Sequence, residues 1–131
     1  KPIISYAPAF EYLGYTAADM ILDEETKFAD YTPSNFASKY YGWVTVREAV
    51  SKSLNVPAVK VLSQVGISRA KGFASSCGIE FDSNDNSLAL ALGGFTYGVS
   101  PMQIAGAYSP LKKGNCLVVV SAVPLPKLSC K

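Results

Sequence analysis

The chain has 131 residues, with 12 Lys and Arg against 10 Asp and Glu, so its formal net charge is +2. A hydrophobic fraction of 49% and a charged fraction of 17% indicate one globular domain and exclude a disordered chain. There is no Lys/Arg run and no apolar stretch of about 18 residues, which argues against nucleic acid as a partner and against a membrane segment. The absence of His excludes His-based triads and the usual zinc sites, so a general base must be Lys, Asp, Glu or Tyr.

The three cysteines are Cys77, Cys116 and Cys130, and no Cys-x-x-Cys pair occurs. Two interpretations stay open: a bridge between Cys116 and Cys130, or a buried thiol at Cys77 with two incidental thiols near the end of the chain. The sequence begins at Lys1 without an initiator Met or a signal peptide, as expected of a fragment of a longer protein.

The first part of the chain, up to Tyr12, is expected to continue a helix, with Pro2 and Pro8 kinking or breaking it. Residues 14–41 have turn residues and little periodicity, which predicts a surface excursion with at most short strands. We expect its aromatic side chains to pin it to the core: Tyr15, Phe28, Tyr31, Phe36, Tyr40, Tyr41 and Trp43. An acidic surface turn is expected at three consecutive carboxylates: Asp23, Glu24 and Glu25.

Thr45-Val46-Arg47-Glu48 is a capping box, with Thr45 as the N-cap and Glu48 at the third helical position. It predicts a helix that ends near Ser53.

A second helix is predicted from about Pro57 to Val65, with Gly66 just past its end. Because a proline disfavours the α conformation in the residue before it, Val56 is expected to be extended and to act as the N-cap.

A third helix is predicted from Ser68 to just before Gly78, and Asp82-Ser83-Asn84-Asp85-Asn86 is predicted to be a turn. The apolar run Leu88–Leu92 has two interpretations, a strand or a buried helical turn. Gly93-Gly94 is expected to form a tight turn after it.

A fourth helix is predicted to begin at Ser100-Pro101, an N-cap followed by proline, and to end near Gly114, with Tyr108 in the core. Residues 1–114 are therefore expected to be mainly α. Residues 115–131 form a divergent apolar tail in which Leu117–Val120 is a candidate strand.

Ser53 and Asn55 are the candidate functional pair that the local pattern offers. Residues two apart in an extended stretch point the same way, so the hydroxyl and the carboxamide are expected to project together from the junction of two helices. The structural alternative is that Ser53 ends one helix and Asn55 caps the next.

Several stretches together carry a family resemblance: KPIISYAPAFE, YTPSNF, YYGWVTVREAVSKSLNVPAVKVLSQVGI, NSLALALGG and GVSPMQIAGAYSPLKKG. In this order they resemble the transpeptidase domain of class A penicillin-binding proteins. The resemblance implies the helical subdomain portion of the penicillin-binding protein/β-lactamase-like α+β fold.

The same resemblance implies a catalytic set. Lys1 matches the lysine of the Ser-x-x-Lys motif, and the nucleophilic serine then belongs three positions before it. Ser53 and Asn55 match the Ser-x-Asn motif, with Ser53 relaying a proton and Asn55 binding the substrate amide. The Lys-Thr-Gly motif has no counterpart, since Lys112-Lys113-Gly114 does not match it, so this chain alone is expected to be inactive.

The resemblance implies a cell-wall enzyme on the outer side of the bacterial cytoplasmic membrane. Its partners would be D-alanyl-D-alanine stem peptides and β-lactams, and no cofactor or metal is expected. Two alternatives remain: a non-catalytic helical module that binds cell-wall peptide or a protein, and a β-lactamase-like or β-lactam sensor relative.

Overall fold

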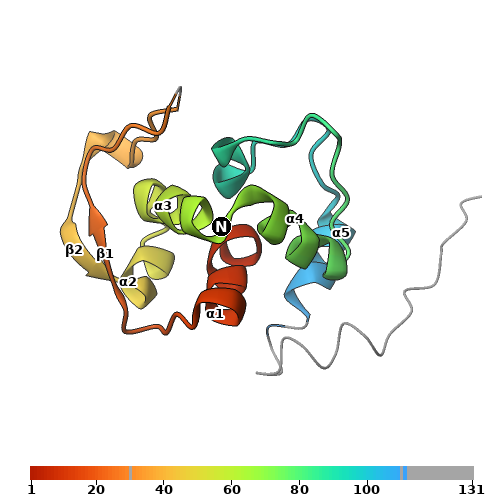
Figure 1. Cartoon of the computed structure of the whole chain (residues 1–131), viewed down its shortest axis with the longest axis horizontal. Helices are drawn as coiled ribbons and strands as arrows, with labels where there is room; N and C mark the ends of the chain where they lie inside the picture. The colour runs from red at the N-terminus through yellow and green to blue at the C-terminus, as the bar shows by residue number, and fades with distance from the viewer. Residues whose placement is uncertain (30, 110, 112–131) are drawn as a thin grey trace, which may run out of the picture.

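The computed structural model describes residues 1–29, 31–109 and 111 (Figure 1). Its elements are, in chain order, η1 (Pro2–Tyr6), α1 (Ala7–Leu13), β1 (Met20–Asp23), η2 (Phe36–Ser38), β2 (Gly42–Thr45), α2 (Val46–Ser51), α3 (Asn55–Val65), α4 (Ile67–Ser76), η3 (Leu88–Leu92) and α5 (Pro101–Tyr108). The prediction of a mainly α chain is confirmed for these residues. The candidate strand Leu117–Val120, the Cys116–Cys130 bridge and the tail 115–131 lie outside the described residues.

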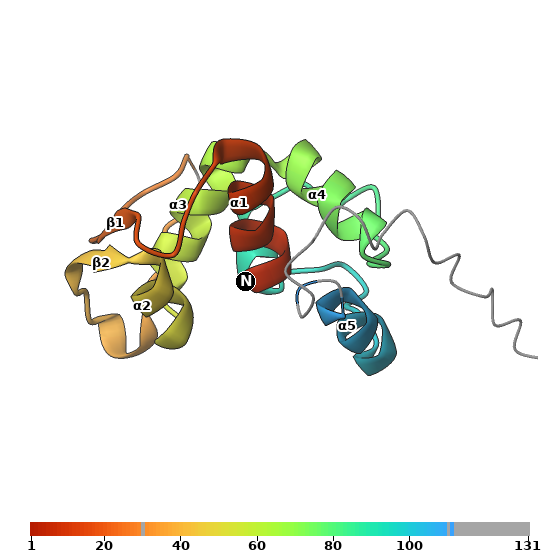
Figure 2. The same ribbon diagram turned by 90° about the horizontal axis from the view of Figure 1, so that it is seen from below.

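Helix α3 is the centre of the core. Seven of its residues are buried: Val56, Pro57, Ala58, Val59, Val61, Leu62 and Val65. It packs against η1, α1, η3, α4 and β1. Figures 1 and 2 show the two strands and α2 on one side of α1 and α3, with α4 and α5 on the other side. A predominantly apolar helix such as α3 is stable only when other elements cover it all round.

The N-terminal helix was expected to kink or break at its prolines, and the structure shows no break there. Residues Pro2–Tyr6 form a π-helical turn that runs directly into α1, because the amide of Ala7 donates to the carbonyl of Pro2, five residues back. Pro8, which has no N–H, lies in the first turn of α1, directly after the π-helical turn. The helix continues to Leu13 and ends at Gly14 in the left-handed region, with φ of 68°.

The excursion contains the antiparallel pair β1 and β2, in which Met20 lies opposite Thr45 and Asp23 opposite Gly42. Its aromatic residues divide into two groups. Tyr15, Phe28 and Tyr31 pack against the core, but the expectation was wrong for three others, which are 95%, 66% and 41% exposed: Phe36, Trp43 and Tyr41. Aromatic packing therefore holds the excursion to the core at its start, through Tyr15, and near its middle, through Phe28 and Tyr31.

Thr45 caps α2 as predicted, since its hydroxyl accepts from the amide of Glu48 at 3.1 Å. The second half of the capping box is not made, because the Glu48 carboxylate pairs with Lys52 at 2.6 Å. Ser100 has a complete box with Gln103 at the start of α5.

Helix α3 begins at Asn55, two residues before the predicted start, and Val56 is helical, so the expectation of an extended Val56 N-cap was wrong. Pro57 is tolerated because the first amides of a helix have no carbonyl acceptor within it. Gly66, with φ of 86°, ends α3 as predicted.

After α4 the chain forms the predicted turn at 82–86, and Leu88–Leu92 is a short 3-10 helix, which agrees with the helical-turn interpretation. Gly93 ends it with φ of 93°. Helix α5 ends at Tyr108, earlier than expected, and the predicted end at Gly114 lies outside the described residues.

Candidate functional site

Lys1 and Ser53 meet although 52 positions separate them. The Lys1 ammonium Nζ donates to the Ser53 hydroxyl Oγ at 2.9 Å and to the Ser53 carbonyl oxygen at 2.5 Å. Lys1 precedes η1 and Ser53 follows α2, so the packing of the N-terminal helix beside α2 and α3 creates this contact (Figure 2). The two acceptors on one residue fix the lysine head group beside the serine hydroxyl.

Ser53 has a left-handed backbone, with φ of 52°. For a residue other than glycine this conformation costs about 1–2 kcal/mol, and here it follows from the sharp exit of the chain from α2. The amides of Ser53 and Leu54 close this exit by donating to the carbonyls of Val50 and Ala49. The expectation that Ser53 and Asn55 share an extended stretch was therefore wrong, because one is left-handed and the other begins α3.

Asn55 is held from a different direction than Ser53. Its carboxamide nitrogen Nδ2 donates to the carbonyl of Ser34 at 2.7 Å, and its own amide donates to the side chain of Asn35 at 2.8 Å. Among the described residues, none donates to the carboxamide oxygen of Asn55. A carbonyl only accepts, so the nitrogen must face Ser34, and the oxygen is the group left for a ligand N–H.

Lys1 also lines a hollow of about 230 Å³ between η1, η3 and α5. Burial lowers the pKa of Lys1 below its ordinary value, since a low-dielectric environment disfavours the charged form. Tyr108 lines the same hollow and is 43% exposed, so its expected place in the core was wrong. The site therefore combines a lysine whose pKa is lowered, a serine hydroxyl bonded to it, and open space beside the lysine.

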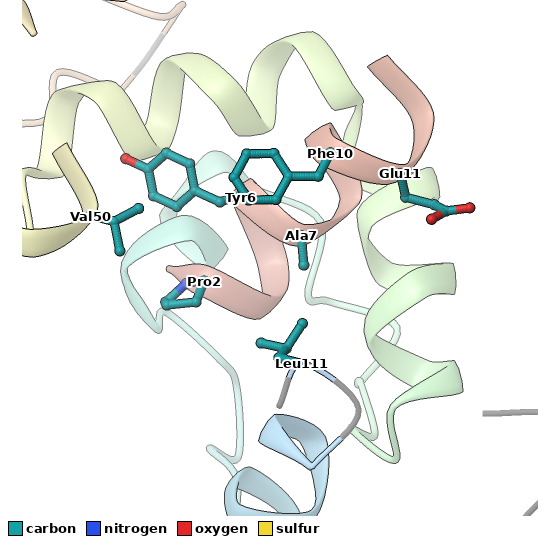
Figure 3. Close-up of a pocket in the computed structure, with 7 residues that line it drawn as sticks. All are labelled: Pro2, Tyr6, Ala7, Phe10, Glu11, Val50 and Leu111. Carbon is teal, nitrogen blue, oxygen red and sulfur yellow. The ribbon is translucent and has the colours of Figure 1, made fainter. Parts of the chain in front are cut away.

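A second, apolar hollow of about 420 Å³ lies on the other side of the N-terminal helix (Figure 3). Pro2, Tyr6 and Phe10 form one wall, and Val50 and Leu111 face them. Burial and the negative charge of Asp23 raise the pKa of Tyr6, so its hydroxyl stays protonated. The lining is mainly apolar, with Glu11 and Tyr6 as the residues that carry polar groups, and it includes neither Lys1 nor Ser53, so this hollow is separate from the candidate site.

Two buried polar residues beside the site escaped prediction as functional neighbours: Asp23 and Asn35. Asp23 was expected in an acidic surface turn, but it is fully buried, because it occupies an inward position of β1 and accepts three hydrogen bonds. One signal could have found Asn35: no good capping residue precedes α3, and a helix end without a local cap needs one from elsewhere.

No group of three His, Cys, Asp or Glu side chains that could hold a metal ion occurs among residues 1–29, 31–109 and 111. In the same part of the chain, none of the helices is both long and apolar enough to cross a bilayer.

Comparison with known proteins finds no matching family model but several relatives. Penicillin-binding protein 1F of Bacillus subtilis is 42% identical over 108 residues, which are 82% of this chain and 15% of that protein. Penicillin-binding protein 1A of Streptococcus pneumoniae is 37% identical over 122 residues, 88% of this chain and 17% of that protein. The crystal structure of penicillin-binding protein 1A from Haemophilus influenzae matches with a TM-score of 0.73 and 29% identity, over 84% of this chain and 17% of that one.

The architecture is thus a helical part of the penicillin-binding protein fold. The homologues of this chain are penicillin-binding proteins, matched over more than four fifths of its length, which confirms the family resemblance of its sequence. The chain spans less than a fifth of the length of these relatives.

Proposed function

We propose that this chain is part of a serine-type D,D-transpeptidase domain that crosslinks cell-wall stem peptides and is acylated by β-lactams. The observation that supports the proposal is the 2.9 Å contact between the Lys1 ammonium and the Ser53 hydroxyl. A partly buried amine beside a hydroxyl is an arrangement suited to moving a proton between a nucleophile and a leaving group. The parent protein acts on the outer side of the cytoplasmic membrane, where stem peptides are crosslinked.

In the proposed reaction, Lys1 in its neutral form accepts the proton of the serine that belongs three positions before it. That serine oxygen attacks the carbonyl carbon between the two terminal D-alanines, and the carbon–nitrogen bond breaks. Ser53 passes its hydroxyl proton to the departing D-alanine nitrogen and takes up from Lys1 the proton that Lys1 had accepted, which returns Lys1 to its neutral form. An amine of a second stem peptide then attacks the acyl-serine, and the serine regains its proton as the new amide forms. The lowered pKa of Lys1 favours the neutral form that starts this sequence.

Asn55 orients the substrate in this proposal. Its carboxamide oxygen has no donor among the described residues, while its nitrogen is held by the Ser34 carbonyl at 2.7 Å. A carboxamide fixed at one end and open at the other is preorganised to accept a hydrogen bond from a backbone N–H of the peptide or from the side-chain amide of a β-lactam.

Labelling with a fluorescent penicillin tests the proposal. We expect no labelling of the 131-residue chain, because it contains neither the nucleophilic serine nor the Lys-Thr-Gly strand that completes the oxyanion hole. Loss of a single oxyanion-hole donor already slows catalysis by about 100-fold or more. The chain extended at both ends to a complete transpeptidase domain is expected to label.

In the extended protein, Ser53→Ala and Asn55→Ala are expected to slow labelling by about ten-fold or more, the effect of about 1.4 kcal/mol in the barrier. Ser51→Ala is the matched control, since Ser51 is exposed and its hydroxyl donates to the Glu48 carbonyl of its own helix. An extended protein that never labels favours a non-catalytic binding module. Rapid hydrolysis of the drug favours a β-lactamase-like relative.

A further inference from the structure

Asp23 and Asn35 form a buried pair between β1 and the start of α3. The side chain of Asp23 is fully buried and Asn35 is 5% exposed. The Asn35 carboxamide nitrogen donates to both carboxylate oxygens of Asp23 at 2.8 Å and to the Lys39 carbonyl at 3.0 Å. A carboxylate only accepts, so Asp23 fixes which end of the Asn35 amide points away from it.

The other end of that amide caps α3. The Asn35 oxygen accepts from the amides of Asn55 at 2.8 Å and Val56 at 3.2 Å. Leu54, the residue at the N-cap position, has no side-chain acceptor, and Pro57 has no amide hydrogen. Asn35 therefore does for α3 what a local Ser, Thr or Asp does for most helices.

The neighbouring residue completes the arrangement. The Ser34 carbonyl holds the side chain of Asn55 while Asn35 holds its main chain, so two consecutive residues fix both parts of Asn55. Leu54 is then the single residue between this fixed point and Ser53. Asp23 itself accepts a hydrogen bond from the amide of Tyr41 at 3.0 Å. This bond connects Asp23 and Asn35 to the loop before β2.

We propose that Asp23 and Asn35 are positioning residues for the Ser-x-Asn segment. Neither touches substrate; Asp23 sets the orientation of Asn35, and Asn35 sets the position of Asn55 and, through Leu54, of Ser53. Hydrogen bonds to an ionised group are about twice as strong as neutral ones, so the carboxylate is what keeps the Asn35 amide from rotating. This inference rests on the proposed function and names residues outside its catalytic set.

Exchanging the two side chains tests the pairing. In the extended transpeptidase protein, Asn35→Asp places a second carboxylate against Asp23, and Asp23→Asn sets two amides against each other. Each single variant is expected to slow acylation by fluorescent penicillin by about ten-fold, which corresponds to about 1.4 kcal/mol. The double variant Asp23→Asn/Asn35→Asp regenerates an amide–carboxylate pair and an acceptor for both α3 amides, so it is expected to recover to within about three-fold of the original rate.

Val65→Ala is the matched control, because Val65 is buried in the last turn of the same helix, far along the chain from the junction. All rates are measured well below each variant's unfolding midpoint. Val65→Ala is expected to lower that midpoint without slowing acylation. If it slows acylation as much as Asn35→Asp does, or if the double variant recovers nothing, the inference is overturned.

Amide hydrogen exchange separates the failure of this inference from failure of the proposed function. The amides of Asn55 and Val56 are expected to lose protection in the single variants and regain it in the double variant, whether or not the protein acylates. A wild-type protein that never acylates overturns the proposed function, whereas unchanged protection in Asn35→Asp overturns the positioning role. If a single variant fails to fold, Asn35→Ser, which keeps a smaller acceptor, is measured in its place with the same expected direction.

Discussion

Two loops flank the central helix α3, and each is organised by a buried aspartate. On the side of the strands, Asp23 accepts from Asn35 and Tyr41. On the side of α5, Asp85 accepts from the amide and hydroxyl of Thr96 at 2.7 and 2.8 Å and from the amide of Asp82 at 2.9 Å. The two carboxylates are alike in burial, since the residues are 0% and 4% exposed, and each accepts three hydrogen bonds.

The loops differ in how far the influence of the aspartate reaches. Asp85 closes its own loop: its donors lie on the turn that contains it and on the segment eleven residues later that returns from η3. Asp23 acts through Asn35 on the end of α3, so its hydrogen bonds extend to the residues proposed for chemistry. The Asp85 carboxylate thus stabilises its own loop, whereas the Asp23 carboxylate orients Asn35, which in turn holds the start of α3.

The largest effect is expected from removing Asp23. Asp23→Ala removes the acceptor of the Tyr41 amide and of one N–H of the Asn35 carboxamide, whose nitrogen keeps the Lys39 carbonyl as an acceptor, and each donor left without an acceptor costs about 1–3 kcal/mol. We expect the free energy of unfolding of the chain to fall by about 3 kcal/mol, measured by urea denaturation, which is a large part of the stability of a small domain.

Glu25→Ala is the control for this change, since Glu25 is an exposed carboxylate two residues further along. It should leave stability within about 0.5 kcal/mol of the original. A loss below about 1 kcal/mol for Asp23→Ala would mean that water replaces the carboxylate, and the contrast between the two loops would then disappear.

An intermediate, pH-dependent effect is expected at Asp85. Burial alone would raise the pKa of Asp85, but hydrogen bonds from Thr96 and Asp82 and the charge of Lys71 outweigh it and hold the pKa below its usual value. The folded state therefore binds this proton less readily than the unfolded state. The stabilisation is complete above the unfolded pKa of about 3.9 and is lost as pH falls through the lower folded value.

Asp85→Asn is accordingly expected to lower the unfolding midpoint by several degrees at pH 7, with a difference from the original chain that shrinks as the solution is acidified below about pH 4. Circular dichroism melting curves from pH 7 to pH 2 measure this. Glu80→Gln, at an exposed position of the same loop, serves as the control and should show no such convergence. A difference that is constant with pH would contradict the assigned role of the charge.

The same contrast explains what the sequence could predict. The turn at 82–86 is encoded by adjacent Asp and Asn residues, and the caps at Thr45 and Ser100 by the residues that follow them, so all were predicted. Asn35 caps a helix twenty residues away, and no local pattern records that partner. Two predictions were wrong for this reason: Asp23 was placed on the surface, and α3 was started at Pro57. In both cases the hydrogen-bond partner lies far along the sequence.

The site was predicted only in part, for a related reason. The closeness of Lys1 and Ser53 followed from a family resemblance rather than from spacing, because 52 residues separate them. The left-handed backbone of Ser53 and the tie between Asn55 and Ser34 arise from packing between helices and the strand loop. Their catalytic roles stay predictions until labelling tests them.

The smallest effect on stability is expected from Thr96→Val, which removes one hydrogen bond to Asp85 and leaves the Asp85 charge in place. The variant loses the hydroxyl bond to Asp85 at 2.8 Å but keeps the amide bond at 2.7 Å. Because Thr96 lies at the surface, water replaces the lost donor, and we expect a loss of about 1 kcal/mol or less. Thr32→Val, at an exposed threonine with no described hydrogen bond, is the matched control. If Asp85 stabilises only its own loop, Thr96→Val also leaves the rate of acylation of the extended protein unchanged. Slower acylation would show that the Asp85 loop affects the candidate site as well.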